Sequence, residues 1–197
     1  MTGTQQASSA GLIEAARTDK SAFSALFRQH YDEIYRYCAR RLPDRGTAED
    51  VTSQVFLKMV RNFDNFTGDE TGFRCWLFRI ACNEVNSFYR TSARHSRAMD
   101  KLRQQAKEPR QTPEEKIDDE NQAKIDFLRT ALGQLKSDHQ DIVTLRYFQG
   151  LNSEQIGEVM HMNPATVRSQ LSRSLKKLKK LYRLRQQQTA EELFDYE

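Results

Sequence analysis

Lysine and arginine side chains gather in one stretch near the C-terminal end of the chain. Residues 164–185 contain eight of them and no aspartate or glutamate. An arginine can donate two hydrogen bonds to guanine, a glutamine can bond adenine, and lysines suit phosphate groups. The stretch therefore has the chemistry of a nucleic-acid contact, although an anionic membrane surface would attract it too.

Two helices joined by a short turn are predicted to carry this cationic stretch. In the segment NSEQIGEVMHMNPATVRSQLSRSLKKLKKLYR, residues 152–183, apolar residues recur three or four apart in both halves, which is helical spacing. Residues 161–163 are too few for anything but a turn, and Asn163 followed by Pro164 is typical of a helix start. The expected apolar stripes are Ile156, Val159 and Met160, then Val167, Leu171, Leu175, Leu178 and Tyr182.

A helix, a turn and a second helix can place a row of side chains in the major groove of DNA. The arginines of the second helix and Gln170 suit base edges, and its lysines suit phosphates. An ordinary helical hairpin with a solvated basic face is the competing interpretation. The candidate contacts are Thr166, Arg168, Ser169, Gln170, Ser172, Arg173, Lys176 and Lys177.

Composition favours an all-α chain with two small helical domains joined by a flexible linker. The chain has 197 residues, 38% hydrophobic and 29% charged, which suits modest cores better than one large core. Glycine and proline are few, and no β-type alternation persists. The net charge of +4 is mild, but residues 124–185 hold twelve basic and five acidic side chains, so the positive charge is regional.

Helical spacing in the first half predicts three helices. The first covers residues 21–42, and the second starts at Thr47, where Asp50 three residues later resembles a capping box. The second helix is expected to bury Val51, Val55, Met59 and Val60. Residues 62–72 form a polar loop in which Phe63 and Phe66 are expected to be exposed, and the third helix runs from residue 73 to about 90.

The predicted organisation has five parts. Residues 1–20 form an arm, 21–90 the first domain, 91–123 the linker, 124–185 the second domain and 186–197 an acidic tail. The linker assignment rests on two prolines and an almost complete lack of large apolar residues. In the second domain, two helices before the helix-turn-helix carry Leu128, Leu132 and Leu135, then Ile142, Val143, Leu145, Tyr147 and Phe148.

The chain lacks the constellations typical of catalysis or metal binding. Its three cysteines have no metal-ligand spacing and are odd in number, so we expect reduced, buried thiols. Its four histidines have no partnered nucleophile, and no glycine-rich phosphate loop is present. No apolar run reaches eighteen residues and no export signal begins the chain, so we expect a cytoplasmic protein without enzymatic activity, cofactor, metal or membrane association.

Both halves of the sequence resemble the bacterial sigma-70 family, in its small extracytoplasmic-function (ECF, group IV) branch. AEDVTSQVFLKMVRNFDNF and FRCWLFRIACNEVNSFYR are similar to region 2, and LGQLKSDHQDIVTLRYFQGLNSEQIGEVMHMNPATVRSQLSRSLKKLK is similar to region 4. The resemblance implies an initiation factor that joins core RNA polymerase, recognises minus-35 and minus-10 promoter elements and helps to open DNA. It also implies an anti-sigma partner and a monomer when free. The alternative is a stand-alone helix-turn-helix regulator, which would have no need of the first domain.

The resemblance also implies roles for residues of the first domain. A base of the minus-10 element must leave the stack to be read, and a pocket must offset that cost. Phe73 is expected in the core, and Trp76 suits the core better than base stacking. The implied minus-10 contacts are Asn65, Phe66, Thr67, Gly68, Asn83, Ser87 and Arg90. The implied contacts to core polymerase are Glu49, Asp50, Gln54, Phe56, Lys58 and Arg61.

Three features depart from the family pattern. Ser53-Gln54 stands where the family commonly has Gln-Glu, and phosphorylation of Thr52 or Ser53 would restore the missing negative charge. Cys82 replaces a frequent basic residue on the helix expected to face the promoter. The tail QQQTAEELFDYE either folds back over the basic helix, docks a partner or stays solvated.

Overall fold

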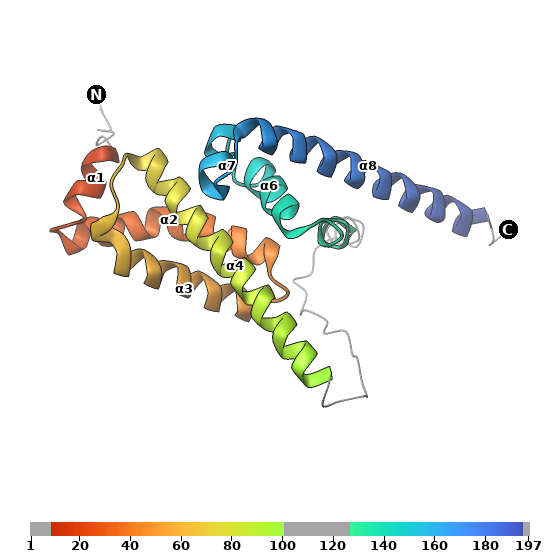
Figure 1. Cartoon of the computed structure of the whole chain (residues 1–197), viewed down its shortest axis with the longest axis horizontal. Helices are drawn as coiled ribbons and strands as arrows, with labels where there is room; N and C mark the ends of the chain where they lie inside the picture. Colours follow the sequence, from red (N-terminus) through yellow and green to blue (C-terminus); the bar gives the residue numbers. More distant parts are fainter. Residues whose placement is uncertain (1–8, 101–126, 195–197) are drawn as a thin grey trace, which may run out of the picture. The chain divides into compact units, whose positions relative to one another are not determined.

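A computed structural model describes residues 9–100 and 127–194, and the side chains of 11–93 and 127–187. The chain forms two compact units (Figure 1). Every regular element in the described ranges is a helix. The prediction of an all-α chain with two helical domains is therefore confirmed.

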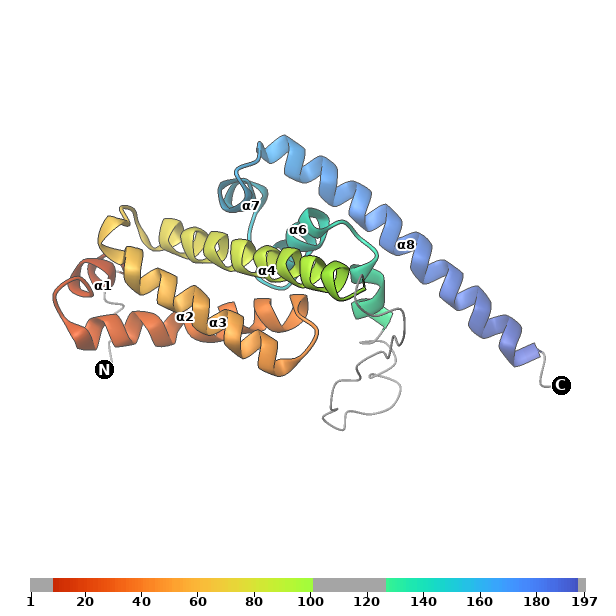
Figure 2. The ribbon, with the colours of Figure 1, turned by 60° about the horizontal axis from the view of Figure 1, so that its bottom comes forward.

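The first unit consists of α1 (Ser9–Ala15), α2 (Lys20–Arg41), α3 (Arg45–Asn62), the short 3-10 helix η1 (Phe63–Asn65) and α4 (Glu70–Asp100). The helices α2, α3 and α4 lie side by side (Figure 2) and enclose the core. Burying this apolar surface stabilises the unit at roughly 25 cal/mol per Å². The largest fully buried side chains here are Leu26, Ile34, Tyr37, Val55, Met59, Phe73, Leu77 and Phe78.

Two aspartates start the helices α2 and α3. Asp19 accepts a hydrogen bond from the backbone of Ser21, and Asp44 accepts two from Thr47, through its backbone nitrogen and its hydroxyl, each at 2.8 Å. The prediction that α3 starts at Thr47 is wrong, because Asp44 is the N-cap and the helix begins at Arg45. A carboxylate that satisfies an orphan amide two or three residues ahead is the usual N-cap arrangement.

The segment between α3 and α4 differs from the polar loop that its composition predicts. Phe63 and Phe66 are 4% and 8% exposed, because both rings pack edge-on against Phe73. Val60, expected in the core, is 52% exposed. Trp76 is only half-buried, whereas Phe73 is in the core as predicted.

Beyond residue 90, α4 continues through Asp100, so the predicted helix end was wrong. The rest of the predicted linker, from 101 onward, lies outside the described residues.

The second unit contains a helical segment at 127–133, α6 (Ser137–Tyr147), α7 (Ser153–Met160) and α8 (Pro164–Phe194). Leu145 is fully buried as predicted, but Phe148 is 43% exposed. The face of α8 that packs inward includes Val167 and Ser174, so Leu175 and Tyr182 are turned outward, contrary to prediction. The fully buried side chains include Ile142, Leu145, Leu151, Ile156 and Val167.

The helix α8 extends without a break to Phe194. Residues 189–194 therefore prolong the basic helix and do not fold back over it. Residues 195–197 lie outside the described range.

The three cysteines are free and buried, as the sequence predicted. Burial raises the pKa of the Cys38 thiol to about 11, although a hydrogen bond between Cys38 and Thr52 acts in the opposite direction. Cys82 is 5% exposed and accepts a hydrogen bond from the Tyr37 hydroxyl at 3.1 Å. It therefore faces α2 and the core, which corrects its assignment to a promoter-facing surface.

Candidate nucleic-acid interfaces

The turn between α7 and α8 has the geometry of a helix-turn-helix, which confirms that prediction. His161 takes a left-handed conformation with φ of 53°, and the backbone nitrogen of Met162 donates to the Gly157 carbonyl at 2.8 Å. A Cβ atom at Gly157 would lie 2.6 Å from the Met162 carbonyl oxygen, so only glycine allows the turn to approach α7 this closely. The side chain of Asn163 accepts from Ala165 and starts α8.

The start of α7 is also fixed by its own side chains. Asn152 accepts a hydrogen bond from the backbone of Gln155 at 2.8 Å, and the Gln155 side chain accepts one from the backbone of Asn152 at 2.9 Å. This reciprocal pair is a capping box and satisfies two backbone amides that the helix leaves free. Local polar contacts thus fix the start of α7, the turn after it and the start of α8.

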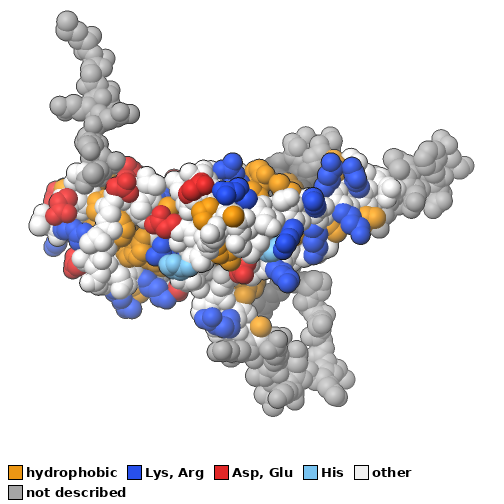
Figure 3. Space-filling model, turned by 45° about the horizontal axis from the view of Figure 1, so that its top comes forward, with side chains coloured by type: hydrophobic (Ala, Val, Ile, Leu, Met, Phe, Trp, Pro, Cys, Tyr) orange, Lys and Arg blue, Asp and Glu red, His pale blue; other side chains and the backbone are white. Residues whose placement is uncertain are grey.

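The outward face of α8 brings together most of the predicted duplex contacts. Lysine and arginine side chains gather along this helix (Figure 3). Arg168 forms an exposed ion pair with Glu154 at 3.3 Å. Such a pair is worth about 1 kcal/mol or less, so a phosphate or a guanine could displace it. The exposed members of the set are Thr166, Arg168, Ser169, Ser172, Arg173, Lys176 and Lys177.

Two of the predicted contacts lie at the margin of the outward face, beside the rest of their own unit. The side-chain oxygen of Gln170 is buried, so this oxygen cannot accept a hydrogen bond from a base edge at the surface. The ammonium of Lys177 donates to the carbonyl of Gln134. Gln170 lies one turn before the buried Ser174 and Lys177 one turn after it, so both are on the same side of α8 as Ser174. The Ser174 hydroxyl donates to the Gln170 carbonyl.

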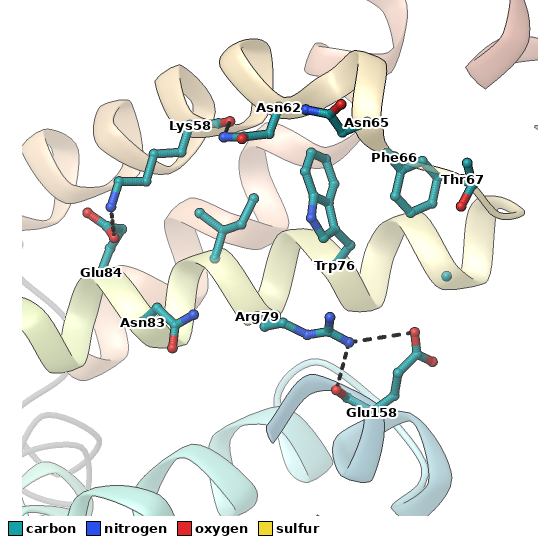
Figure 4. A pocket seen from close by; sticks show the side chains of 12 residues that line it. Lys58, Asn62, Asn65, Phe66, Thr67, Trp76, Arg79, Asn83, Glu84 and Glu158 are labelled. Carbon is teal, nitrogen blue, oxygen red and sulfur yellow. Dashed lines mark hydrogen bonds and ion pairs between the residues drawn. The ribbon is translucent and has the colours of Figure 1, made fainter. Parts of the chain in front are cut away.

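A second candidate interface is a hollow in the first unit, between the C-terminal end of α3, η1 and the middle of α4 (Figure 4). Trp76 rises from α4 and its ring lies 5.2 Å from that of Phe66, centroid to centroid. The side chains of Asn62 and Asn65 lie at the end of α3 and in η1, beside this aromatic pair. An aromatic face beside exposed amides can stack a base and bond its edge.

The structure brings only some of the predicted minus-10 residues to this hollow. Asn65, Thr67 and Asn83 line it with exposed side chains, whereas Phe66 is buried and forms part of its floor. Gly68 has φ of 148°, and a Cβ there would lie 3.1 Å from the Phe66 ring. Ser87 and Arg90 lie further along α4 and do not line the hollow.

Sequence reasoning missed several residues that line the hollow. Trp76 and Arg79 lie at helical spacing from the predicted Asn83 on α4, and this spacing could have grouped all three on one face. Asn62 was assigned to a loop, although its amide donates to the Lys58 carbonyl and continues α3. Lys58, predicted to contact polymerase, forms an ion pair with Glu84 of α4 at 2.5 Å and also lines the hollow.

The outer face of α3 carries the other predicted polymerase contacts except Phe56. Glu49, Asp50, Gln54 and Arg61 are exposed. Phe56 is 3% exposed and lies within 4.5 Å of the Phe27 ring, centroid to centroid, so it belongs to the packing between α2 and α3. The outer face also carries two apolar side chains that the sequence did not place there. Leu57 is 40% exposed and Val60 is 52% exposed.

Thr52 is not available for phosphorylation in this fold. The residue is 0% exposed, and its hydroxyl donates to the Ala48 carbonyl at 2.7 Å. Ser53, in contrast, is exposed. The hypothesis that phosphorylation replaces the missing acidic group therefore fails for Thr52 and stays a prediction for Ser53 alone.

A helix-turn-helix with a cationic second helix and a separate helical unit with an aromatic hollow define a two-domain nucleic-acid-binding protein. Residues 26–95 match the Sigma-70 region 2 family and residues 128–178 match Sigma-70, region 4. The RNA polymerase sigma factor YlaC of Bacillus subtilis is 30% identical, over 82% of this chain and 92% of its own. The ECF RNA polymerase sigma factor BldN of Streptomyces coelicolor is 31% identical over 86% of this chain and 64% of its own. The chain therefore belongs to the sigma-70 family and is a sigma factor of the ECF type, which excludes the stand-alone regulator.

Solved structures share the fold. The sigma factor RpoE from Bartonella quintana, determined with the anti-sigma factor NepR, aligns with a TM-score of 0.64 and 21% identity, over 82% of this chain and 96% of that one. CnrH, determined with the cytosolic domain of CnrY, aligns with a TM-score of 0.67 and 19% identity, over 89% and 97%. In the part of the chain that the structure describes, no helix is both long and apolar enough to cross a membrane.

Proposed function

We propose that this sigma factor reads a promoter at two places and docks on core polymerase through a third surface. The outward face of α8 takes the minus-35 element as duplex, the hollow between α3 and α4 takes a base of the minus-10 element, and the outer face of α3 binds the polymerase. The observation that supports this proposal most strongly is the half-buried Trp76 beside the amides of Asn62 and Asn65.

The hollow suits a base that has left the duplex. Flipping a base costs a few kcal/mol, and stacking on an aromatic ring returns about 1–3 kcal/mol. In the proposed arrangement Trp76 provides the stacking face, and Asn65 and Thr67 offer hydrogen-bond groups to the base edge. Asn83, on the same face of α4, lies where the flanking strand would pass, with Ser87 and Arg90 following it along the helix.

The face of α8 suits duplex DNA. Arg168 and Arg173 are the proposed readers of guanine, while Thr166, Ser169, Ser172 and Lys176 lie on the same exposed surface and would contact phosphates or bases. This division follows from chemistry, because the guanidinium group has a fixed two-pronged geometry and an ammonium does not.

The outer face of α3 suits a protein partner. Its exposed residues combine acids, the apolar Leu57 and Val60, and the basic Arg61. A mixed surface with an apolar centre is typical of a protein interface. We infer that core polymerase binds there. We also infer that an anti-sigma factor is a further partner, because the related RpoE was determined with the anti-sigma factor NepR. A factor that works with RNA polymerase acts in the cytoplasm.

Run-off transcription with purified core polymerase on a pool of random promoter fragments tests all three assignments. Asn65→Ala should lower strand opening while leaving polymerase binding intact, and Arg173→Ala should lower duplex binding by about 1–3 kcal/mol. Leu57→Asp should abolish polymerase binding and leave duplex binding unchanged. Each variant is the control for the other two. Equal loss of all three activities in folded Asn65→Ala protein would contradict the separation of sites.

A further inference from the structure

We propose that Arg17 is a positioning residue that holds the turn between α3 and α4 in the conformation needed to receive a base. This inference rests on the base-binding function proposed for the hollow. Arg17 follows α1, in a part of the chain to which the sequence assigned no role. It contacts neither the aromatic face nor the exposed amides of the hollow, so its effect would be exerted through the backbone of the turn.

The guanidinium group of Arg17 binds three backbone carbonyls of this turn. One terminal nitrogen donates to the Asp64 carbonyl at 3.2 Å and to the Phe63 carbonyl at 3.4 Å, and the other donates to the Phe66 carbonyl. The charged group also lies 5.5 Å from the centroid of the Phe63 ring. The arginine makes these contacts from two separate nitrogens of its planar fork. A lysine carries all its donors on one nitrogen and cannot reproduce this geometry.

The Phe63 carbonyl already accepts a hydrogen bond from the Phe66 amide at 3.0 Å, whereas the carbonyls of Asp64 and Phe66 lie where the described backbone supplies no donor. Phe63 is the C-cap of α3 and opens η1, so the carbonyls that follow have no helical amide to receive. A positive charge at a helix C-terminus is also attracted by the negative end of the helix dipole. Arg17 thus supplies hydrogen-bond donors to the carbonyls of Asp64 and Phe66 from outside the turn.

Arg17 is itself held in place. Ile13 and Ala16 of the preceding segment are 3% and 6% exposed and fix α1 against the unit. The side chain of Arg17 is 23% exposed. Its Nε also donates to Glu14 at 3.1 Å, but the Glu14 side chain is 79% exposed, so this pair contributes little to the placement of Arg17. Two residues later Asp19 caps α2. The cation is therefore placed between two anchored helices and is preorganised before DNA arrives.

We call the hydrogen bonds from Arg17 to the carbonyls of Phe63, Asp64 and Phe66 the clamp. Its contact with the Phe66 carbonyl connects the clamp to the hollow. The Phe66 ring is part of the floor and lies against Trp76, while Thr67, the next residue, lines the rim. Fixing the Phe66 backbone fixes both groups at once. A site held near its productive geometry binds more tightly than one that must be ordered on binding.

The test uses the full chain and its single tryptophan. Because Trp76 is the only tryptophan, its quenching by acrylamide reports on the hollow alone. Arg17→Met keeps an unbranched apolar stem without the donors, and Arg17→Lys keeps the charge without the fork. Glu14→Gln is the matched control, because it removes only the exposed ion pair. Circular dichroism first establishes that each variant is folded at the temperature used.

We expect Trp76 to become more accessible to acrylamide in Arg17→Met and Arg17→Lys, and to be unchanged in Glu14→Gln. Affinity for sequences that the wild-type chain selects from a pool of random single-stranded DNA should fall about tenfold in the same two variants, in line with the loss of charge-assisted hydrogen bonds. Duplex binding through α8 should be unaffected.

Folded Arg17→Met protein with unchanged quenching and unchanged selection would overturn the proposal. If the wild-type chain selects no single-stranded DNA, but the quenching still increases in Arg17→Met, then the clamp is real and the base-binding function of the hollow is wrong. The two failures are thus distinguishable.

Discussion

Glu33 of α2 contacts His30 on the same helix and Arg74 on α4. Its carboxylate lies 2.5 Å from Nδ1 of His30 and accepts a hydrogen bond from Nε of Arg74 at 2.7 Å. Burial by itself would raise the pKa of Glu33, but the hydrogen bonds from His30 and Arg74 outweigh it, so the pKa lies below its ordinary value of 4.5. The folded chain therefore favours the charged form of this carboxyl group.

This lowered pKa predicts how the first unit responds to acid. A depressed pKa gives stability that is fully present above pH 4.5 and is lost as the pH falls below it, because the proton then binds more readily to the unfolded chain. Glu33→Gln should lower the free energy of unfolding at pH 7 by about 1–3 kcal/mol and flatten its dependence on pH below 4.5. Asp32→Asn, at the exposed neighbouring position, is the control. Urea unfolding followed by Trp76 fluorescence measures both; parallel acid profiles for Glu33→Gln and wild type would contradict the assignment.

At the scale of elements, the helix-turn-helix depends on the close approach of its turn to α7. The carbonyl of Met162 lies where a side chain at Gly157 would begin, and this carbonyl belongs to the backbone, which cannot rotate away. Gly133, also helical, has no atom within 4 Å of its Cβ position. Alanine substitutions at the two glycines therefore form a matched pair. Both change the helix propensity, but only the one at Gly157 creates a close contact.

Gly157→Ala should destabilise the second unit by about 1–3 kcal/mol and weaken duplex binding, because the turn must shift to admit a methyl group. Gly133→Ala should be neutral or add about 0.5–1 kcal/mol, since alanine favours a helix. Chemical unfolding followed by circular dichroism, together with a duplex titration, measures the effects. Gly157→Ala protein that is as stable as wild type would show that the turn can relax without cost.

The elements that the sequence predicts well are those whose signals are local. Apolar spacing indicated α2, α7 and α8, and Asn163 followed by Pro164 indicated the start of α8. Predictions failed where a distant partner decides the outcome. Phe63 and Phe66 lie in a polar stretch, yet Phe73 buries them, and Arg17 binds carbonyls 46 to 49 residues away. No spacing within the chain reveals such a partner.

The phase of a helix is also difficult to predict when its apolar residues outnumber its core positions. In α8, Leu175 and Tyr182 fit the apolar spacing, but the small Ser174 takes the buried position and bonds His139. In α3, apolar spacing placed Val60 inside and the family resemblance placed Phe56 outside, and the structure reverses both. These errors fall at the surfaces proposed for partners, where exposed apolar residues are needed for binding.

At the scale of the whole molecule, the distribution of charge matters more than its sum. A net charge of +4 over 197 residues would steer the chain only weakly toward DNA, but the exposed cations of α8 lie on one helix without an acidic side chain in residues 164–185. Each phosphate that such a helix neutralises releases counterions, so affinity depends on salt.

This distribution predicts that the affinity for DNA depends steeply on salt. It also predicts that replacing single lysines changes this dependence by unequal amounts. Lys176 is exposed on the outward face, whereas the ammonium of Lys177 is bonded to the Gln134 carbonyl and Lys20 lies in the first unit. In titrations of random-sequence duplex DNA, Lys176→Ala should reduce the slope of log K against log salt by roughly 0.9, the value for one phosphate contact. Lys177→Ala should reduce it less and Lys20→Ala not at all, although all three remove one positive charge. If the three slopes fall equally, net charge alone drives binding and the outward face of α8 has no special role.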